Sequence, residues 1–337
     1  MKIIFFELLP EEKAYIGSRL TEHGVKPHYS DTPLDKDHVP QETGAEALCV
    51  FVNCRIDEET LIHFPNLKYI ATRSTGFDHI DLLACAKRNI VVSSVPSYGE
   101  NTVAEFTFAL LLALSRKITD AHHQVKETGS FSVQNLRGFD LKGKTMGIIG
   151  TGKIGKHVAR IARGFEMNII TCDTHPDETL KKETTCEYLD LDELLARSDI
   201  VTLHVPSIPQ TKHLINKERI AKMKDGAYII NTSRGEIIDT HALIEALVNK
   251  KLGGAALDVL EEEGAIKDEL NLLATGHPEE HNLKTILMGH ALINMPNVIV
   301  TPHTAFNTWE AIQRILDTTV ENIISFTKHN PINVVKS

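Results

Sequence analysis

The strongest constraint on the fold is a group of glycines that follows an apolar, β-prone segment at residues 145–149. Gly150, Gly152 and Gly155 have the spacing G-x-G-x-x-G, and a helix is expected at residues 154–164. The first glycine permits a tight turn, the second lets a pyrophosphate approach the backbone, and the third lets helix and strand pack closely. Free N–H groups at the start of the helix would then face the phosphates. A lone glycine turn is weak evidence, but its strand–turn–helix context predicts a dinucleotide site.

The type of dinucleotide is predicted from the end of the next strand, at residues 168–172. Asp173 follows that strand at the distance, about 20 residues, where a carboxylate binds the ribose hydroxyls. Thr174 and His175 come next, and no arginine adjoins them to hold a 2′-phosphate. We therefore predict NAD rather than NADP.

Strand and helix candidates alternate along both parts of the chain. In the first part we expect strands at residues 2–6, 47–52, 68–72 and 90–93, and helices at 11–23 and 57–64. In the second part we expect six strands, at 145–149, 168–172, 199–204, 227–231, 255–259 and 297–301, with helices at 154–164, 191–196, 217–223 and 239–249. The alternation predicts an α/β protein with two doubly wound parallel-sheet domains.

The order of these segments predicts that a Rossmann NAD-binding domain, residues 101–301, is inserted into a flavodoxin-like substrate domain, residues 1–100 plus 302–337. A single long helix is expected at 101–127, and a closing helix at 309–328. Residues 261–295 read as an irregular insertion. Two histidines in it, His277 and His281, are four positions apart, but Pro278 between them favours a solvated loop over a metal site.

Composition excludes several classes of protein. The net charge of −9 argues against a general nucleic-acid binder, which must neutralise phosphates. The longest apolar run, residues 106–114, is far shorter than the ~20 residues of a membrane span. The 5 cysteines form no CxxC pair and are interpreted as reduced thiols. With no targeting segment, we expect a cytoplasmic protein without metal, membrane or nucleic-acid partners.

Ionisable residues follow three of the strands expected in the second part of the chain. Arg234 comes shortly after residues 227–231, Asp258 and Glu263 lie at and beyond the end of 255–259, and His303 follows 297–301. Ligands of doubly wound sheets bind at this carboxyl edge. A guanidinium can hold a keto acid's carboxylate, and a histidine can give the proton when hydride reaches the carbonyl carbon. A nearby carboxylate would orient the imidazole and favour its protonated form.

Each of these residues also has a simpler interpretation. The chain has 17 histidines, so any single one is more often a surface or capping residue. Glu263 follows Glu261 and Glu262 in what could be a solvated acidic loop. The convergence of the residues, rather than any one of them, supports a site.

Longer motifs resemble the D-isomer-specific 2-hydroxyacid dehydrogenase family over nearly the whole chain. They are Arg73-Ser74-Thr75-Gly76-Phe77-Asp78, Val95-Pro96-Ser97-Tyr98, Thr102-Val103-Ala104-Glu105, Leu203-His204-Val205-Pro206, Asn231-Thr232-Ser233-Arg234-Gly235, Ala256-Leu257-Asp258-Val259 and Thr301-Pro302-His303-Thr304.

The resemblance implies a role for each matched residue. It implies that Arg234 binds substrate, that Glu263 partners His303 as the acid/base, and that Thr75 and Gly76 offer backbone N–H groups to the substrate carboxylate. It also implies homodimers, with the helix after Asn101 at the interface. The residues expected at NAD, besides the three glycines, are Lys153, Ile154, Asp173, His204, Val205, Pro206, Thr211, Thr232, Ser233 and Asp258.

Within that family the run Thr301-Pro302-His303-Thr304-Ala305-Phe306 is similar to the D-lactate dehydrogenase group. The resemblance implies reversible reduction of a small 2-keto acid by NADH, with Tyr98 and Phe306 around its side chain. Pyruvate is the first candidate, followed by 2-ketoisocaproate, glyoxylate and hydroxypyruvate. Asn53 is a departure, because the lactate enzymes often have tyrosine there. A NAD-sensing, corepressor-like binding protein is the alternative from another class.

Overall fold

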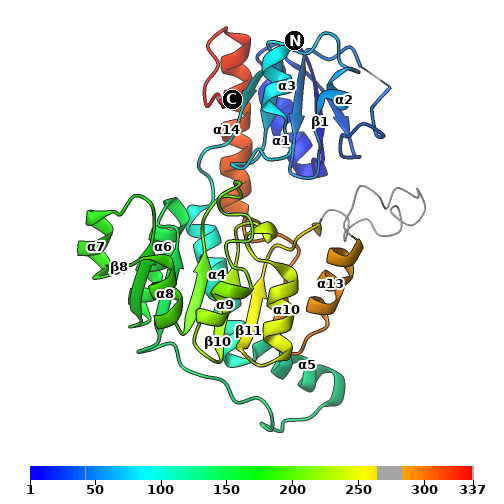
Figure 1. Cartoon of the computed structure of the whole chain (residues 1–337). Helices are drawn as coiled ribbons and strands as arrows, with labels where there is room; N and C mark the ends of the chain where they lie inside the picture. The colour runs from blue at the N-terminus through cyan, green and yellow to red at the C-terminus, as the bar shows by residue number, and fades with distance from the viewer. Residues whose placement is uncertain (42, 264–282, 336–337) are drawn as a thin grey trace. The chain divides into compact units, whose positions relative to one another are not determined.

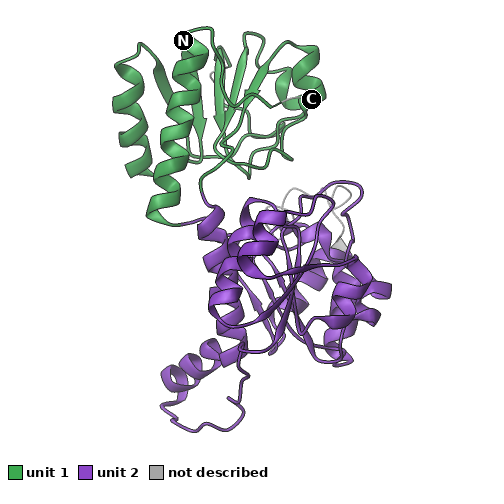
Figure 2. Cartoon of the chain, turned by 90° about the vertical axis from the view of Figure 1, so that its left-hand side faces the viewer, with its two compact units in different colours: residues 1–98, 308–337 green, residues 99–307 purple. Residues whose placement is uncertain are grey.

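The computed structural model describes residues 1–41, 43–263 and 283–335 (Figure 1). The chain divides into two compact units (Figure 2). Unit 1 consists of residues 1–98 and 308–337, and unit 2 of residues 99–307. No helix among the described residues is both long and apolar enough to cross a membrane.

Unit 1 is a five-stranded parallel sheet of order β2-β1-β3-β4-β5, covered by helices on both faces. Its strands are β1 (Lys2–Phe6), β2 (Lys26–Ser30), β3 (Ala47–Val50), β4 (Tyr69–Thr72) and β5 (Val91–Ser93). Its helices are α1 (Pro10–Thr21), α2 (Glu58–Leu61), α3 (Leu82–Lys87) and α14 (Trp309–Thr327). Strand periodicity sends Ile3 and Phe5 into the core with α1 and α14, and Ile4 and Phe6 into the core with α2 and α3.

Unit 2 is a seven-stranded parallel sheet of order β12-β11-β10-β9-β6-β7-β8. Its strands are β6 (Thr145–Ile149), β7 (Asn168–Cys172), β8 (Glu187–Tyr188), β9 (Ile200–Leu203), β10 (Ala227–Asn231), β11 (Leu252–Leu257) and β12 (Val298–Val300). One face is covered by α4 (Glu100–Arg116), α6 (Lys153–Gly164) and α7 (Glu178–Thr184). The other is covered by α8 (Leu191–Arg197), α9 (Lys217–Lys222), α10 (Thr240–Val248) and α13 (Leu283–Ile293).

The predicted fold class is confirmed, since both sheets are parallel and doubly wound. In unit 2, β7 and β8 lie on one side of β6, and β9, β10 and β11 lie on the other, which is the Rossmann order. Strand β12 extends the sheet beyond β11. In unit 1 the order 2-1-3-4-5 is the flavodoxin-like one.

Some predicted elements were wrong or missing. The single helix expected at 101–127 is two helices, α4 and α5 (Ile118–Thr128), because Lys117 adopts a left-handed conformation with φ of 51°. Strands β2 and β8 were not predicted, and both lie at sheet edges and lack an apolar run. The part of the predicted irregular insertion at 283–293 is helix α13. The rest of the insertion that falls at 264–282, including His277 and His281, lies outside the described residues.

Candidate active site

The glycine turn connects β6 to α6 and leaves no room for side chains. Gly150 has φ of 94°, and a Cβ placed there would lie 2.4 Å from the carbonyl oxygen of His204. A Cβ on Gly155 would lie 2.0 Å from the carbonyl oxygen of Gly150. Around Gly152, the N-cap of α6, nothing lies within 4 Å of such an atom. Two glycines therefore shape the turn, and the third leaves open space at the helix start, which fits a bound pyrophosphate.

Asp173, directly after β7, lies against this turn. Its Oδ2 accepts hydrogen bonds from Thr151 N at 2.6 Å and Thr151 Oγ1 at 3.1 Å, and its Oδ1 accepts one from His175 N at 2.8 Å. Burial by itself raises the pKa of the Asp173 carboxyl group, but the hydrogen bonds from His175 and Thr151 outweigh it and leave the pKa below its usual value. The group is thus an anionic acceptor beside the glycine turn, which suits ribose hydroxyls and repels a 2′-phosphate.

His204 lies on the other side of the turn, after β9. Its backbone N–H donates to Ile149 O at 2.7 Å, and its Nε2 lies 2.9 Å from Thr202 Oγ1. Its Nδ1 is buried and has no hydrogen-bond partner among the residues that the structure describes. Burial lowers the pKa of His204 to about 3, so the ring is neutral at physiological pH. A buried polar atom without a partner beside the glycine turn fits a site that is completed by a ligand.

The other residues predicted at NAD lie on the same edge of the sheet or on α6. The Thr211 hydroxyl donates to Pro206 O at 2.5 Å, which closes the turn after Val205. The Thr232 hydroxyl is paired with that of Thr107 at 3.0 Å, and Ser233 Oγ donates to Leu203 O. Lys153, in the first turn of α6 ahead of Ile154, pairs with Glu100 at 3.7 Å.

The structure brings two of the three predicted catalytic residues into direct contact. His303 Nδ1 lies 2.6 Å from Glu263 Oε1, and both side chains are partly exposed. His303 has an unusual left-handed backbone with φ of 51°, and its N–H donates to Asp258 O at 2.8 Å. Arg234 lies on the same edge after β10, where its Nη1 donates to Ser233 O at 2.8 Å. A backbone strained in this way at a strand end is typical of functional sites.

Asp258 holds the loop that carries His303. The Asp258 carboxylate is buried and accepts hydrogen bonds from Thr301 Oγ1 at 2.6 Å, Thr304 N at 2.9 Å and Ala305 N at 2.9 Å. Burial raises the pKa of Asp258, although these hydrogen bonds act in the opposite direction. The Asp258 carboxylate, which was predicted at NAD, is thus hydrogen-bonded to the protein itself. These bonds position His303 and its neighbours.

Glu261 shows that the acidic run 261–263 is not simply a solvated loop. Its Oε1 lies 2.7 Å from His213 Nε2, and its Oε2 accepts hydrogen bonds from the backbone and hydroxyl groups of Thr240. A Cβ on Gly235 would lie 2.1 Å from the carbonyl carbon of Leu260, so the backbones beside Arg234 and Glu261 are in close contact. The sequence carried no sign of the Glu261–His213 pair, because its members are 48 positions apart.

The residues predicted in unit 1 lie at the carboxyl edge of its sheet. Thr75 and Gly76 follow β4, and the Thr75 hydroxyl donates to Val95 O at 2.7 Å while Gly76 O accepts from Ser74 Oγ at 2.6 Å. The backbone carbonyl of Tyr98 accepts from Arg314 Nε at 2.5 Å. Phe306 belongs to unit 2, where it is partly buried after the His303 loop.

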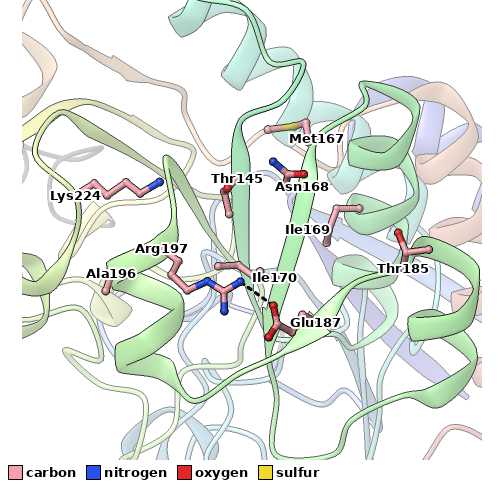
Figure 3. A pocket seen from close by; sticks show the side chains of 10 residues that line it. All are labelled: Thr145, Met167, Asn168, Ile169, Ile170, Thr185, Glu187, Ala196, Arg197 and Lys224. Carbon is pink, nitrogen blue, oxygen red and sulfur yellow. Dashed lines mark hydrogen bonds and ion pairs between the residues drawn. The ribbon is translucent and has the colours of Figure 1, made fainter.

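A cavity of about 540 Å³ lies in unit 2 away from these residues (Figure 3). Its lining includes Thr145 and Asn168, the first residues of β6 and β7, so it opens at the amino edge of the sheet. Arg197 points into it but pairs with Glu187 at 2.7 Å, and Lys224 pairs with Asp199 at 2.9 Å. Its lining cations are thus already paired, and we do not assign it to the reaction.

The parallel sheets, the glycine turn and the His–Glu pair define a nucleotide-binding oxidoreductase of the α/β class. Residues 108–305 match the NAD-binding domain of the D-isomer specific 2-hydroxyacid dehydrogenases. The chain belongs to this family of NAD-binding enzymes.

Several similar proteins are named for one particular activity within this family. The D-lactate dehydrogenase kk1H of Curvularia clavata is 37% identical over 98% of this chain and 94% of its own. The structure of the pyruvate reductase of Chlamydomonas reinhardtii matches with a TM-score of 0.87 and 36% identity, over 98% of each chain. The Aquifex aeolicus D-lactate dehydrogenase, solved with NAD and lactic acid, matches with a TM-score of 0.85 and 36% identity, over 99% of this chain and 100% of that one.

Proposed function

We propose that the protein reversibly reduces a small 2-keto acid to the D-2-hydroxy acid with NADH, and that pyruvate and D-lactate are its substrate pair. The observation that carries the proposal is the 2.6 Å contact between His303 Nδ1 and Glu263 Oε1. It fixes the imidazole through one nitrogen and leaves Nε2 to exchange a proton with substrate. Names of relatives such as the D-lactate dehydrogenase of Escherichia coli, 35% identical, support pyruvate; 2-ketoisocaproate, glyoxylate and hydroxypyruvate are the alternatives.

Each residue has a defined part in this reaction. Arg234 binds the substrate carboxylate and polarises the ketone, and the backbone N–H groups of Thr75 and Gly76 bind the carboxylate as well. Bound NADH supplies the hydride, which adds to the carbonyl carbon. His303 gives the proton from Nε2 to the ketone oxygen, and Glu263 stabilises the charged imidazole before that transfer. In the oxidative direction His303 Nε2 takes the proton back.

A panel of 2-keto acids tests the proposal. The purified protein is mixed with NADH and each keto acid, absorbance is followed at about 340 nm, where reduced nicotinamide absorbs, and the product is resolved into D and L forms. We expect D-lactate from pyruvate, and a roughly thousandfold lower kcat for His303→Ala. His241→Ala, at an exposed histidine of α10, is the matched control. Turnover of His303→Ala at the wild-type rate would contradict the mechanism.

We also propose a homodimer that pairs through α5 and the segment after it. In Figure 2 this part of unit 2 extends away from the sheet, and α5 buries none of its residues. Helix α5 exposes Ile118 (54%) and Val125 (40%), and the segment after it exposes Phe131 (86%) and Val133 (84%). Large exposed apolar side chains that recur along one segment support an interaction surface there. Light scattering should give the mass of two chains for the wild type and of one chain for Phe131→Asp/Val133→Asp.

We propose that the protein works in the cytoplasm. All 5 cysteines are free thiols, which fits a reducing compartment. Burial raises the pKa of Cys49 and of Cys54 to about 12 each, which leaves both thiols protonated and unreactive. Protein purified without reductant and then unfolded should give 5 thiols per chain in a colorimetric thiol assay.

A further inference from the structure

Three loops at the carboxyl edge of the unit 2 sheet carry residues of the proposed reaction. Residues 205–211, proposed at NAD, follow β9, Arg234 follows β10, and Glu263 lies beyond β11. These three strands are neighbours in a parallel sheet, so their loops begin side by side at one edge. The geometry of the site therefore depends on how the three loops are held to one another.

The Glu261 carboxylate joins the loop after β11 to the other two loops. Its Oε1 lies 2.7 Å from Nε2 of His213, which is in the loop after β9. Its Oε2 accepts hydrogen bonds from the N–H of Thr240, at 3.1 Å, and from the Thr240 hydroxyl. Thr240 is the first residue of α10, which follows the loop after β10. The Glu261 side chain is 14% exposed, so these partners replace most of its hydration.

His213 is a fixed partner, because backbone hydrogen bonds hold its loop to the loop after β10. The His213 N–H donates to Glu236 O at 2.7 Å, and two residues further on the Ile215 N–H donates to Ile237 O at 3.0 Å. His213 has φ of 49°, which a non-glycine residue adopts only when its surroundings impose it. The contact with His213 thus ties Glu261 to a backbone that is already held in place.

The position of Glu263 depends on the turn that Glu261 anchors. Glu262, between the two, lies in this turn and has φ of 55°. Beyond it, Glu263 Oε2 accepts from the Leu260 N–H at 3.4 Å, and Glu263 Oε1 lies 2.6 Å from His303 Nδ1. The Glu263 side chain therefore folds back over the anchored residues, and its direction toward His303 depends on where they are held.

We propose that Glu261 and His213 are positioning residues, which hold the Glu263 carboxylate against His303 for proton transfer. They act through the turn at 260–263 rather than on the substrate. Without the Glu261 carboxylate this turn loses its bonds to the other two loops, and Glu263 can move away from the imidazole. Misplacement of a catalytic group by about 1 Å can cost about a hundredfold in rate. This inference rests on the proposed function and adds two residues to it.

A double-mutant cycle separates positioning from a general effect on the fold. Glu261→Ala should lower kcat and kcat/KM for pyruvate equally, about tenfold, because it weakens proton transfer rather than substrate binding. In the Glu263→Ala background the same substitution should change kcat less than about twofold, because no carboxylate remains to be positioned. Loss of folded protein would instead lower kcat by the same factor in both backgrounds.

Two further variants are matched to Glu261→Ala. Glu261→Gln keeps an acceptor for Thr240 and an amide that can donate to His213, so it should keep most of the wild-type kcat. Glu245→Ala is the control, since Glu245 Oε1 pairs with Lys217 at 2.8 Å and joins α9 to α10 in the same unit. It should lower kcat in neither background.

The outcomes distinguish this inference from the function on which it rests. If Glu261→Ala lowers kcat by the same factor with and without Glu263, or does not lower it at all, the positioning role is overturned and the proposed function stands. If the wild type reduces no 2-keto acid with NADH, the proposed function fails, and the positioning role with it. Should Glu261→Ala not fold, His213→Ala gives the same cycle at a side chain that is 40% exposed. It must likewise lower kcat only when Glu263 is present.

Discussion

Two arginines at strand ends show how differently the two units use the same residue. Arg234, after β10 in unit 2, is partly exposed, and its Nη1 donates to the adjacent Ser233 carbonyl. Arg73, after β4 in unit 1, is 3% exposed and donates to Phe6 O at 2.7 Å and Glu7 O at 2.9 Å. The position after a parallel strand therefore does not by itself make an arginine a ligand-binding group. Access to solvent distinguishes the two side chains.

The largest effect that we expect is on catalysis, from Arg234→Gln. In the proposed mechanism this guanidinium binds the substrate carboxylate in a bidentate way, so its loss should lower kcat/KM about a thousandfold, mostly through substrate affinity. Arg234→Lys keeps the charge without the fork geometry and should recover only part of that loss. Steady-state kinetics with pyruvate and NADH measure both.

Arg55→Gln, at an arginine side chain that is 72% exposed, is the control for removing one positive charge. The thermal midpoint of Arg234→Gln should stay within a few degrees of the wild type, since surface changes rarely affect stability much. A large fall in the midpoint would mean that Arg234 is structural, as Arg73 is, and that the comparison between the two is wrong.

The next effect is on stability, from Arg73→Met. Removing this guanidinium leaves the Glu12 carboxylate, whose side chain is 9% exposed, buried without its partner at 3.7 Å. Breaking a buried pair on one side costs about 3 kcal/mol. The carbonyls of Phe6 and Glu7 lose their donor as well. Urea unfolding should show the loss, while kcat of the folded fraction changes little.

A second substitution sharpens this result. Glu12→Gln added to Arg73→Met removes the uncompensated charge, and its amide oxygen can still accept the Leu9 N–H that Glu12 Oε2 binds at 2.9 Å. The double variant should therefore regain part of the lost stability. If it is no more stable than Arg73→Met, the Arg73–Glu12 pair does not explain the loss.

The parts of the fold that the sequence predicted are those in which the pattern of buried residues is local. Strands β6, β7 and β10 have the predicted bounds, because each is a largely buried run of five residues next to a turn or polar segment. The break at Lys117 was missed, because it is neither glycine nor proline and the helical pattern continues past it. Edge strand β2 was missed because its Lys26–Ser30 segment is polar and half exposed.

The same limit applies to the candidate site. Strand ends and family motifs placed His303 and Glu263 on one edge, and these two are in contact. No local pattern showed that the Asp258 carboxylate would accept hydrogen bonds from residues 301–305. Nor did one show that Glu7 would be hydrogen-bonded to Asn53, 46 positions away. Such pairings depend on which strands become neighbours and on the conformation of the loops between them, neither of which a local pattern specifies.

The smallest effect that we expect is on the pH dependence of stability. It follows from comparing two histidines of unit 2. Burial lowers the pKa of His204 to about 3, whereas His303 is partly exposed beside Glu263. In the unfolded chain His204 regains its ordinary pKa of 6.5, so between pH 6.5 and 3 the unfolded state binds the extra proton. Stability must then fall as the pH falls through this window. The contribution of His204 is about 2 kcal/mol between pH 7 and pH 5.

His204→Gln removes the group that binds this proton, so the free energy of unfolding should depend less on pH by that amount. Urea unfolding at pH 7 and pH 5 without NADH measures it. His241→Gln, at an exposed histidine of α10, should keep the wild-type dependence. If His204→Gln and the wild type lose the same stability between the two pH values, His204 is not kept neutral by burial. Its unpaired Nδ1 would then be reached by water, and would no longer mark a place that NAD completes.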